Sequence, residues 1–438
     1  MEPSASLQSL ETRQTTAGRS KIFSNRNFLL LWFGQGTSVI GDQFSMIALP
    51  WLVLLLTGDP VQLGIVLALT GVPRAVFMLV GGAMTDRFSQ RSVMLASDVL
   101  RLLLTTVLAG VIFSGQLQLW MLYLFALAFG TVSAFFLPAS SSIVPRIVRN
   151  EDLMTGNSII QGTSALSVFI GPLLAGGLIA LFTAGSAAQT GSSSSTFGIG
   201  LAIAIDALTF LVSAITLWLM RVEKPHSTEI AQTGIFTSIR DGLAFLLKTR
   251  KLLYMFVIIA ALNFLFSGPA IVGIPVISNN RLAEGAAAFG IIMSAFAAGN
   301  LMGYIGSGAI KIKPQHIGLT AVVIIGIFGV GMALFGYITS MWAGAAILFL
   351  LGIMNGYISI VLITLLQKNT PADMMGRLMS LVMFSSMGLV PISQALAGFL
   401  FKISIEYVFL GCGILIVLLA IVAALSKEVR NFGVEAAD

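Results

Sequence analysis

Residues 81–91 read Gly-Gly-Ala-Met-Thr-Asp-Arg-Phe-Ser-Gln-Arg, so one acid and two arginines stand between two long apolar segments. These segments, residues 61–84 and 92–113, are each long enough to cross a hydrocarbon core of about 30 Å as a helix that rises about 1.5 Å per residue. Charged side chains are costly inside a bilayer. We therefore expect residues 81–91 to form a loop between two membrane-spanning helices.

Apolar segments of similar length recur along the whole chain. Of its 438 residues, 57% are hydrophobic and 10% are charged, whereas ordinary soluble proteins are about 25% charged. The sequence therefore predicts an all-α membrane protein with twelve transmembrane helices. The expected spans are residues 28–56, 61–84, 92–113, 118–141, 155–183, 198–220, 252–278, 286–309, 317–338, 341–366, 377–401 and 404–425.

The spans fall into two sets of six, divided by residues 221–251, the longest polar stretch after the N-terminal tail. Pro172 and Gly177 in the fifth span have counterparts at a similar offset in the eleventh, Pro391 and Gly398. This favours duplication of a six-helix unit, the arrangement in which two halves of a transporter rock around a central site. We predict pseudo-symmetric six-helix bundles at 28–220 and 252–425, a cytoplasmic central loop at 221–251, and cytoplasmic tails at 1–27 and 426–438.

Two loops have a composition of their own. The central loop contains Ile235–Leu247, whose apolar spacing suits an interfacial amphipathic helix. Residues 184–197 are rich in Gly and Ser and carry no charge, so they are expected to form a flexible outer loop.

The basic residues are unequally divided between the two sides of the membrane. Of the 24 Lys and Arg residues, twenty fall in the tails and loops on the N-terminal side, while Arg281 and Lys402 fall on the other side and Arg74 and Arg101 lie within spans. The positive-inside rule then places both termini in the cytoplasm, with the chain in the inner (plasma) membrane. The same rule accounts for the net charge of +6, and no nucleic-acid partner is expected.

Residues suited to enzymatic chemistry are scarce. Cys412 is the single cysteine, and His226 and His316 fall in polar loops. The sequence contains no Ser-His-Asp set, no metal-ligand cluster and no Gly-x-x-x-x-Gly-Lys-Ser/Thr loop for ATP. We therefore expect neither an enzyme nor an ATP-driven pump, and no cofactor or metal. The expected partners are the lipid bilayer, a small-molecule substrate and protons, and the chain is expected to be a monomer.

Three acids fall in the interior of spans, namely Asp42, Asp98 and Asp206, and Asp42 is the deepest. A charge at the bilayer centre costs about 2.5–3.5 kcal/mol on insertion scales, so each acid needs a partner, a water-filled cavity or a proton. Asp42 also belongs to a polar stripe, which we interpret as a cavity wall and as the reason to predict Asp42 as the main proton-coupling carboxylate. The alternative is that the stripe only hydrogen-bonds neighbouring helices. The stripe consists of Gln35, Ser38, Asp42 and Ser45.

Arg74 is the expected partner of Asp42. It follows Pro73 near the middle of the second span, where a proline tends to bend a helix. The pair has two interpretations. It is either a proton-coupled switch, since neutralising the acid would leave the arginine unpaired, or a permanent buried ion pair.

The remaining charged residues near the cytoplasmic side are interpreted as a conformational gate. Asp98 and Arg101 are three residues apart and are expected to form a local pair that supports the Asp86–Arg87 loop. The gate comprises Gly82, Asp86, Arg87, Arg91, Asp98 and Arg101. Asp206, Gln161 and Asn263 are assigned to the substrate cavity together with the stripe residues, and for Asp206 a structural bond to a neighbouring helix is the alternative.

Residues 82–91 resemble the loop between the second and third helices of the major facilitator superfamily. The family pattern is Gly, three residues, Asp, Arg/Lys, one residue, Gly, Arg, Arg/Lys. Gly82, Asp86, Arg87 and Arg91 match this pattern, whereas Ser89 and Gln90 stand where the family has Gly and Arg. Residues 28–51 also resemble the first helix of the macrolide-efflux and enterobactin-exporter-like branch, and the resemblance covers nearly the whole chain.

The fifth span is similar to the motif Gly-Pro-x-x-Gly-Gly of exporters in that superfamily, except that three residues separate Pro172 from Gly176. The motif implies antiport, and the physical alternative is tight helix packing around small residues. The residues concerned are Gly162, Gly171, Pro172, Gly176 and Gly177.

The resemblance implies the major facilitator fold and export driven by the proton gradient. The expected function is proton-coupled efflux of amphiphilic, drug-like or macrolide-like small molecules by alternating access. The alternatives within transport are a siderophore exporter and a lipid translocator. A membrane receptor or scaffold that transports nothing is the alternative outside it.

Overall fold

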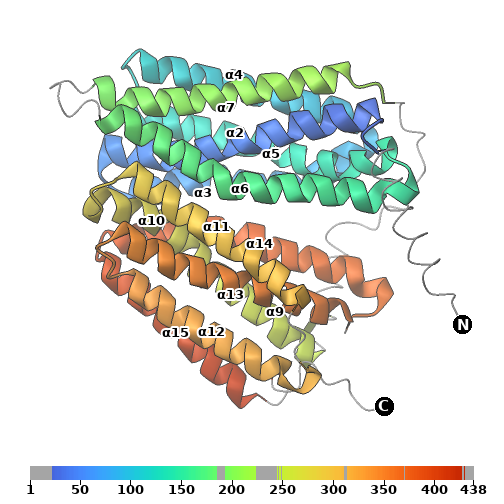
Figure 1. Cartoon of the computed structure of the whole chain (residues 1–438), viewed down its shortest axis with the longest axis vertical. Helices are drawn as coiled ribbons and strands as arrows, with labels where there is room; N and C mark the ends of the chain where they lie inside the picture. The colour runs from blue at the N-terminus through green and yellow to red at the C-terminus, as the bar shows by residue number, and fades with distance from the viewer. Residues whose placement is uncertain are drawn as a thin grey trace, which may run out of the picture.

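The computed structural model of the chain consists of long helices packed side by side in two bundles (Figure 1). It describes residues 22–184, 193–222, 249–309, 313–368 and 370–426, together with Ala244, Leu246, Leu247 and Val429. Within this part of the chain, twelve helical segments are long and apolar enough to span a membrane. The predicted all-α class and the number of spans are confirmed.

The first bundle contains six long helices and one short helical turn. These are α2 (Arg26–Thr57), α3 (Pro60–Arg87), α4 (Gln90–Phe113), α5 (Leu119–Ile147), the turn η1 (Asn150–Asp152), α6 (Leu153–Ala184) and α7 (Ser193–Leu219).

The second bundle repeats this plan, with its first span in three consecutive pieces. They are α9 (Arg250–Leu262), the π-helix η2 (Asn263–Ser267) and α10 (Gly268–Arg281). The remaining elements are α11 (Ala286–Ala309), the turn η3 (Pro314–His316), α12 (Ile317–Phe335), α13 (Met341–Lys368), α14 (Ala372–Phe401) and α15 (Ile405–Leu425).

The expected loop at residues 81–91 is much shorter than predicted. Helix α3 continues to Arg87 and α4 begins at Gln90, so only Phe88 and Ser89 separate the two helices. A charged sequence leaves the hydrocarbon, but it need not leave the helix, because a helix satisfies its own backbone hydrogen bonds in water as well as in lipid. The hydroxyl of Ser89 then caps α4 by accepting a hydrogen bond from the backbone N–H of Ser92.

Two other loop predictions concern residues that lie largely outside the described part of the chain. Of the expected amphipathic helix at Ile235–Leu247, only Ala244, Leu246 and Leu247 are described. The expected outer loop at 184–197 is shorter than predicted, since α7 begins at Ser193.

The bundles contact each other near the ends of helices that lie away from the chain termini. A Cβ atom added at Gly64 of α3 would lie 3.0 Å from the Cα of Gly398 in α14, and one added at Gly290 of α11 would lie 3.1 Å from the Cα of Gly176 in α6. These separations leave no room for a side chain. Small residues therefore let the backbones of opposite bundles touch at two places.

Gly290→Leu should destabilise the contact between the bundles, because the new side chain would overlap the backbone of α6. Overpacking of this kind costs about 1–3 kcal/mol. The measurement is the thermal unfolding midpoint of the purified protein in detergent. Gly177→Leu is the matched control, since nothing lies within 4 Å of a Cβ at that position. Equal midpoints for the two variants would contradict the close approach.

Candidate functional site: a buried charge cluster and a separate cavity

Arg101 of α4 is the centre of a charge cluster inside the first bundle. Arg101 is 3% exposed, and Asp98, one turn earlier on the same helix, is fully buried. The guanidinium of Arg101 donates a short hydrogen bond to the carboxylate of Asp98. A second guanidinium nitrogen lies 3.9 Å from the carboxylate of Asp42 in α2. The arginine therefore joins acids from two helices.

Two phenylalanine rings enclose the same guanidinium. Its carbon lies 4.2 Å from the ring centroid of Phe136 in α5 and 4.5 Å from that of Phe210 in α7. A cation held against ring faces away from water gains about 2 kcal/mol or more. Among the described residues, the Nε atom of Arg101 has no hydrogen-bond partner. The rings fix the position of the arginine without neutralising its charge.

Asp206 of α7 completes the cluster. It is fully buried, and its carboxylate accepts a short hydrogen bond from the hydroxyl of Ser45 in α2. The close approach of the two helices depends on Gly41, since a Cβ there would lie 2.7 Å from a carboxylate oxygen of Asp206. Asp98 accepts a further hydrogen bond of 2.5 Å from the Ser213 hydroxyl. Two carboxylates thus contact Arg101, and a third, that of Asp206, lies within electrostatic range of it.

The predicted pairing of Asp42 with Arg74 is not an ion pair in the structure, although the charge of Arg74 still acts on Asp42. The structure pairs Asp42 with Arg101, while the side chain of Arg74 is exposed on the surface of α3. The expected Asp98–Arg101 pair is present, but it lies in the buried cluster. Its partners across the bundle are Asp42 and Ser213, so it is a part of the cluster.

The polar stripe of α2 faces its neighbours in three different ways. Ser45 bonds to Asp206, Ser38 is 2% exposed, and the side-chain oxygen of Gln35 is buried with no hydrogen-bond partner among the described residues. The side chain of Asp42 is the most exposed of the ion-paired side chains in the cluster. Its exposed fraction is 38%, compared with 4% for Arg101 and 0% for Asp98. Gln161 lies on the exposed surface of α6.

The structure describes the side chains of only some of the predicted gate residues. Gly82, Asp86 and Arg87 lie in the helical end of α3, and their side chains are outside the described part of the chain. Arg91 is described, and its guanidinium donates hydrogen bonds of 2.7 and 2.6 Å to the backbone carbonyls of Leu217 and Trp218. An arginine that binds the last carbonyls of a helix satisfies orphan acceptors there. Arg91 thus attaches the start of α4 to the end of α7.

The glycines of the fifth span serve helix contacts. A Cβ at Gly171 would overlap the side chain of Gln43 in α2, so this glycine permits contact within the bundle. Gly176 meets α11 of the other bundle, whereas Gly162 and Gly177 have open space around them. Pro172 lies within α6, which continues through it. The packing interpretation accounts for Gly171 and Gly176.

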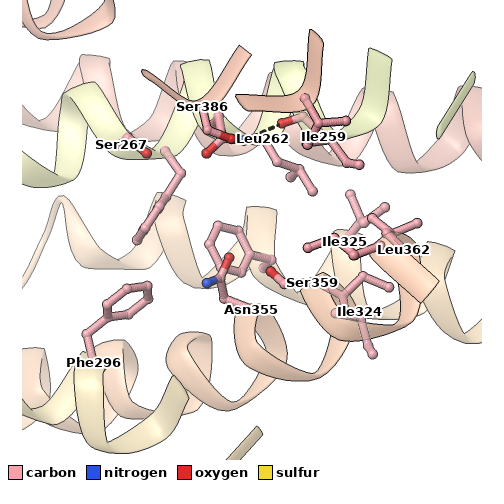
Figure 2. A pocket seen from close by; sticks show the side chains of 16 residues that line it. Ile259, Leu262, Ser267, Phe296, Ile324, Ile325, Asn355, Ser359, Leu362 and Ser386 are labelled. Carbon is pink, nitrogen blue, oxygen red and sulfur yellow. Dashed lines mark hydrogen bonds between the residues drawn. The ribbon is translucent and has the colours of Figure 1, made fainter. Parts of the chain in front are cut away.

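A cavity of about 260 Å³ lies inside the second bundle, away from the charge cluster. Its walls come from α9, η2, α11, α12, α13 and α14, and Asn263, which was assigned to the substrate cavity, is one of the lining residues. Figure 2 shows Ser267 and Ser386 on one side of the space, with Asn355 and Ser359 opposite them. The sequence did not single out several aromatic and hydroxyl-bearing lining residues, namely Phe266, Phe296, Phe328, Ser359 and Ser386.

The comparisons with known proteins establish the family. The family model of the Major Facilitator Superfamily matches residues 31–393. The chain therefore belongs to the Major Facilitator Superfamily, and it is a multi-pass membrane transporter of small molecules and not an enzyme.

Its relatives and structural neighbours extend over almost its whole length. Macrolide efflux protein A of Streptococcus pyogenes is 24% identical over 410 residues, which are 92% of this chain and 96% of the relative. Multidrug efflux pump Tap of Mycobacterium tuberculosis is 26% identical over 390 residues, with coverages of 86% and 87%.

Among solved structures, a bacterial homologue of the iron transporter ferroportin in the inward-facing state has a TM-score of 0.69 at 16% identity, with coverages of 92% and 99%. Nucleoside transporter NupG has a TM-score of 0.71 at 16% identity, with coverages of 91% and 98%. At these identities, the two structural similarities show a shared fold only.

Proposed function

We propose that the protein exports amphiphilic small molecules by alternating access and exchanges them for protons at the buried charge cluster. The observation that carries this proposal is the charge balance of the cluster, in which Asp42 and Asp98 contact the single guanidinium of Arg101 and Asp206 interacts with it only electrostatically. With all three acids ionised, the cluster would carry a net charge of two negative units inside a helical bundle. A buried charge without a partner costs several kcal/mol, so this state requires water or bound protons.

Asp42 is the acid placed to exchange a proton. Its side chain is 38% exposed, and its contact with Arg101 is the looser of the two at 3.9 Å. Protonation of Asp42 leaves Arg101 still bonded to Asp98, so the arginine never loses its counter-ion. A conformational change that alters the access of water to Asp42 would then alter its affinity for a proton.

The export direction rests on two kinds of support. Relatives that cover most of the chain are named as efflux proteins. The excess of Lys and Arg on the side of the termini favours cytoplasmic termini. Together they favour release on the side opposite the termini.

Cysteine labelling tests this orientation. After Cys412→Ser, a cysteine at Gln116 in the exposed α4–α5 turn should react with an impermeant maleimide on intact cells, and a cysteine at exposed Phe88 should react only after the membrane is opened. Labelling of the Phe88 position from outside intact cells would reverse the orientation and the export direction with it.

The function itself is tested with purified protein in proteoliposomes under an imposed pH gradient. A panel of macrolides, hydrophobic cations and neutral aromatic compounds is offered as substrate. We expect at least one class to accumulate uphill only while the gradient lasts. If no member of the panel is moved and none changes internal pH, the proposed proton-coupled export of amphiphilic molecules is wrong.

A further inference from the structure

We propose that the cavity in the second bundle is a docking subsite for an uncharged, ring-bearing end of the transported molecule. This inference rests on the proposed function, because it names the chemistry of the substrate that the exporter recognises. The cavity and the charge cluster lie in opposite bundles. Binding of the ring and binding of protons are therefore assigned to different halves of the protein.

The lining excludes a charged ligand group. Figure 2 draws the side chains of 16 residues, and among these described residues none is an acid or a base. An ion placed there would lose its hydration without gaining a counter-ion. The part of a substrate that enters the cavity is therefore neutral.

Three phenylalanines give the cavity an aromatic wall. The ring centroid of Phe266 in η2 lies 5.1 Å from that of Phe296 in α11 and 4.9 Å from that of Phe328 in α12. The ring planes of Phe266 and Phe328 meet at 70°. Aromatic rings pack favourably edge to face or offset, and each such pair adds about 0.5–1.5 kcal/mol beyond its burial. A flat ring entering this space has faces and edges to pack against.

Polar groups with unused hydrogen-bonding capacity face the aromatic wall. The amide nitrogen of Asn355 donates to the side-chain oxygen of Asn300 at 2.8 Å, and within the described residues its own carbonyl oxygen accepts no hydrogen bond. The hydroxyls of Ser359 and Ser267 likewise make none within that part of the chain. Some helical hydroxyls elsewhere bond to a carbonyl four residues back, as Ser167 does at 2.9 Å.

The π-helix shapes the wall that carries these groups. Residues Asn263–Ser267 form η2, and Asn263 donates to the carbonyl of Ile259 at 3.0 Å and to the hydroxyl of Ser386 at 3.4 Å. The carbonyl of Phe264 accepts a hydrogen bond from Ser393 of α14. π-Helical turns are rare and recur at functional sites. Here the turn places Asn263, Phe266 and Ser267 on the cavity.

The volume limits what the cavity holds. Sites for complete drug-sized ligands are about 300–1,000 Å³, so 260 Å³ suits one ring system and not a whole macrolide. The rest of such a molecule must remain outside. The substrate class is therefore an amphiphile with an uncharged ring carrying one or two hydrogen-bonding atoms, attached to a larger or more polar body.

Photolabelling in lipid nanodiscs tests the subsite without any transport step. The probe is a benzyl alcohol with a trifluoromethyl-diazirine on its ring, and the comparison probe is the corresponding benzylamine, which is cationic at neutral pH. Peptide mass spectrometry should find saturable labelling by the alcohol in residues 259–267 and 355–363, suppressed by excess unlabelled benzyl alcohol. The amine should label these residues at least about tenfold less.

Ser359→Phe fills the cavity and should lower the saturable labelling at least about tenfold. Ile360→Phe is the matched control, because Ile360 is the next residue on α13 and is 41% exposed. The Ile360→Phe variant should show the same amount of saturable labelling as the wild-type protein. The wild-type mass map alone also decides the matter if Ser359→Phe fails to fold. Saturable labelling absent from both segments, or equal for alcohol and amine, would overturn the subsite.

The transport assay separates this inference from the proposed function. If the protein pumps substrate uphill but shows no saturable labelling in the two segments, the proposed subsite is wrong and the proposed export function stands. If the protein is labelled as described but moves no solute, the proposed subsite stands and the proposed export function is wrong.

Discussion

Asp42→Asn should abolish uphill accumulation of substrate in proteoliposomes while leaving downhill exchange measurable. Asparagine keeps the shape and much of the hydrogen bonding of the carboxylate, but it cannot take up or release a proton. Because Arg101 remains bonded to Asp98 in this variant, the bundle should stay folded. The expected loss in gradient-driven accumulation is at least about tenfold, the factor that corresponds to 1.4 kcal/mol of driving force.

Glu284→Gln is the matched control for this experiment. Glu284 is an exposed acid in the turn between α10 and α11, so its neutralisation removes a carboxylate without touching the cluster. It should accumulate substrate at the wild-type level. An Asp42→Asn protein that pumps like this control would leave Asp42 as a structural partner of Arg101.

Arg101→Leu should have the largest effect on stability. It would leave Asp98 and Asp206 buried with hydroxyl partners but without the cation. Removing one partner of a buried ion pair costs about 3–5 kcal/mol. The variant should therefore unfold at a clearly lower temperature in detergent, or fail to accumulate in the membrane. Thermal unfolding followed by the intrinsic fluorescence of tryptophan measures the difference.

Arg74→Leu gives the comparison that this prediction needs. Both arginines lie within spans, but the side chain of Arg74 is exposed. Its loss should change the unfolding temperature little. A larger destabilisation from Arg74→Leu than from Arg101→Leu would restore Arg74 as the essential partner of the acids. In addition, Arg101→Lys should fall between wild type and leucine, because lysine keeps the charge and loses the planar group between Phe136 and Phe210.

The spans were predictable because length and apolarity alone decide whether a helix can cross a membrane. All twelve predicted spans overlap spanning helices of the structure. The end of α3 was not predictable on the same grounds. The charges of residues 81–91 indicate contact with water, and a helix that projects beyond the hydrocarbon satisfies this as well as a loop does.

The identity of the ion pair needed information that periodicity does not supply. Asp42 had two arginines within spans to choose from, Arg74 and Arg101, and the choice depends on how each helix is rotated about its axis. In the structure, Arg74 of α3 is exposed and acts on Asp42 only at a distance, whereas Arg101 of α4 is buried between Phe136 and Phe210. The three acids could be predicted as special because each is expensive in a bilayer.

The cavity of the second bundle was largely hidden from sequence reasoning. Asn263 could be singled out as a polar residue in an apolar span, but Asn355 and Ser359 belong to another helix, and their convergence is a property of the packed bundle. The spacing of Asn355 and Ser359, four residues apart on α13, places both on one helix face and was the available signal. The π-helix at Asn263–Ser267 left no mark in the apolar pattern.

Proton movement driven by substrate tests the proposed exchange of substrate for protons most directly. Proteoliposomes containing the wild-type protein and an internal pH dye are loaded with a substrate identified in the panel, then diluted so that only a substrate gradient remains. Efflux of substrate should drive protons into the vesicles, and Asp42→Asn should remove this flux while Glu284→Gln retains it. Substrate efflux from the wild-type protein with no change in internal pH would show that substrate is not exchanged for protons.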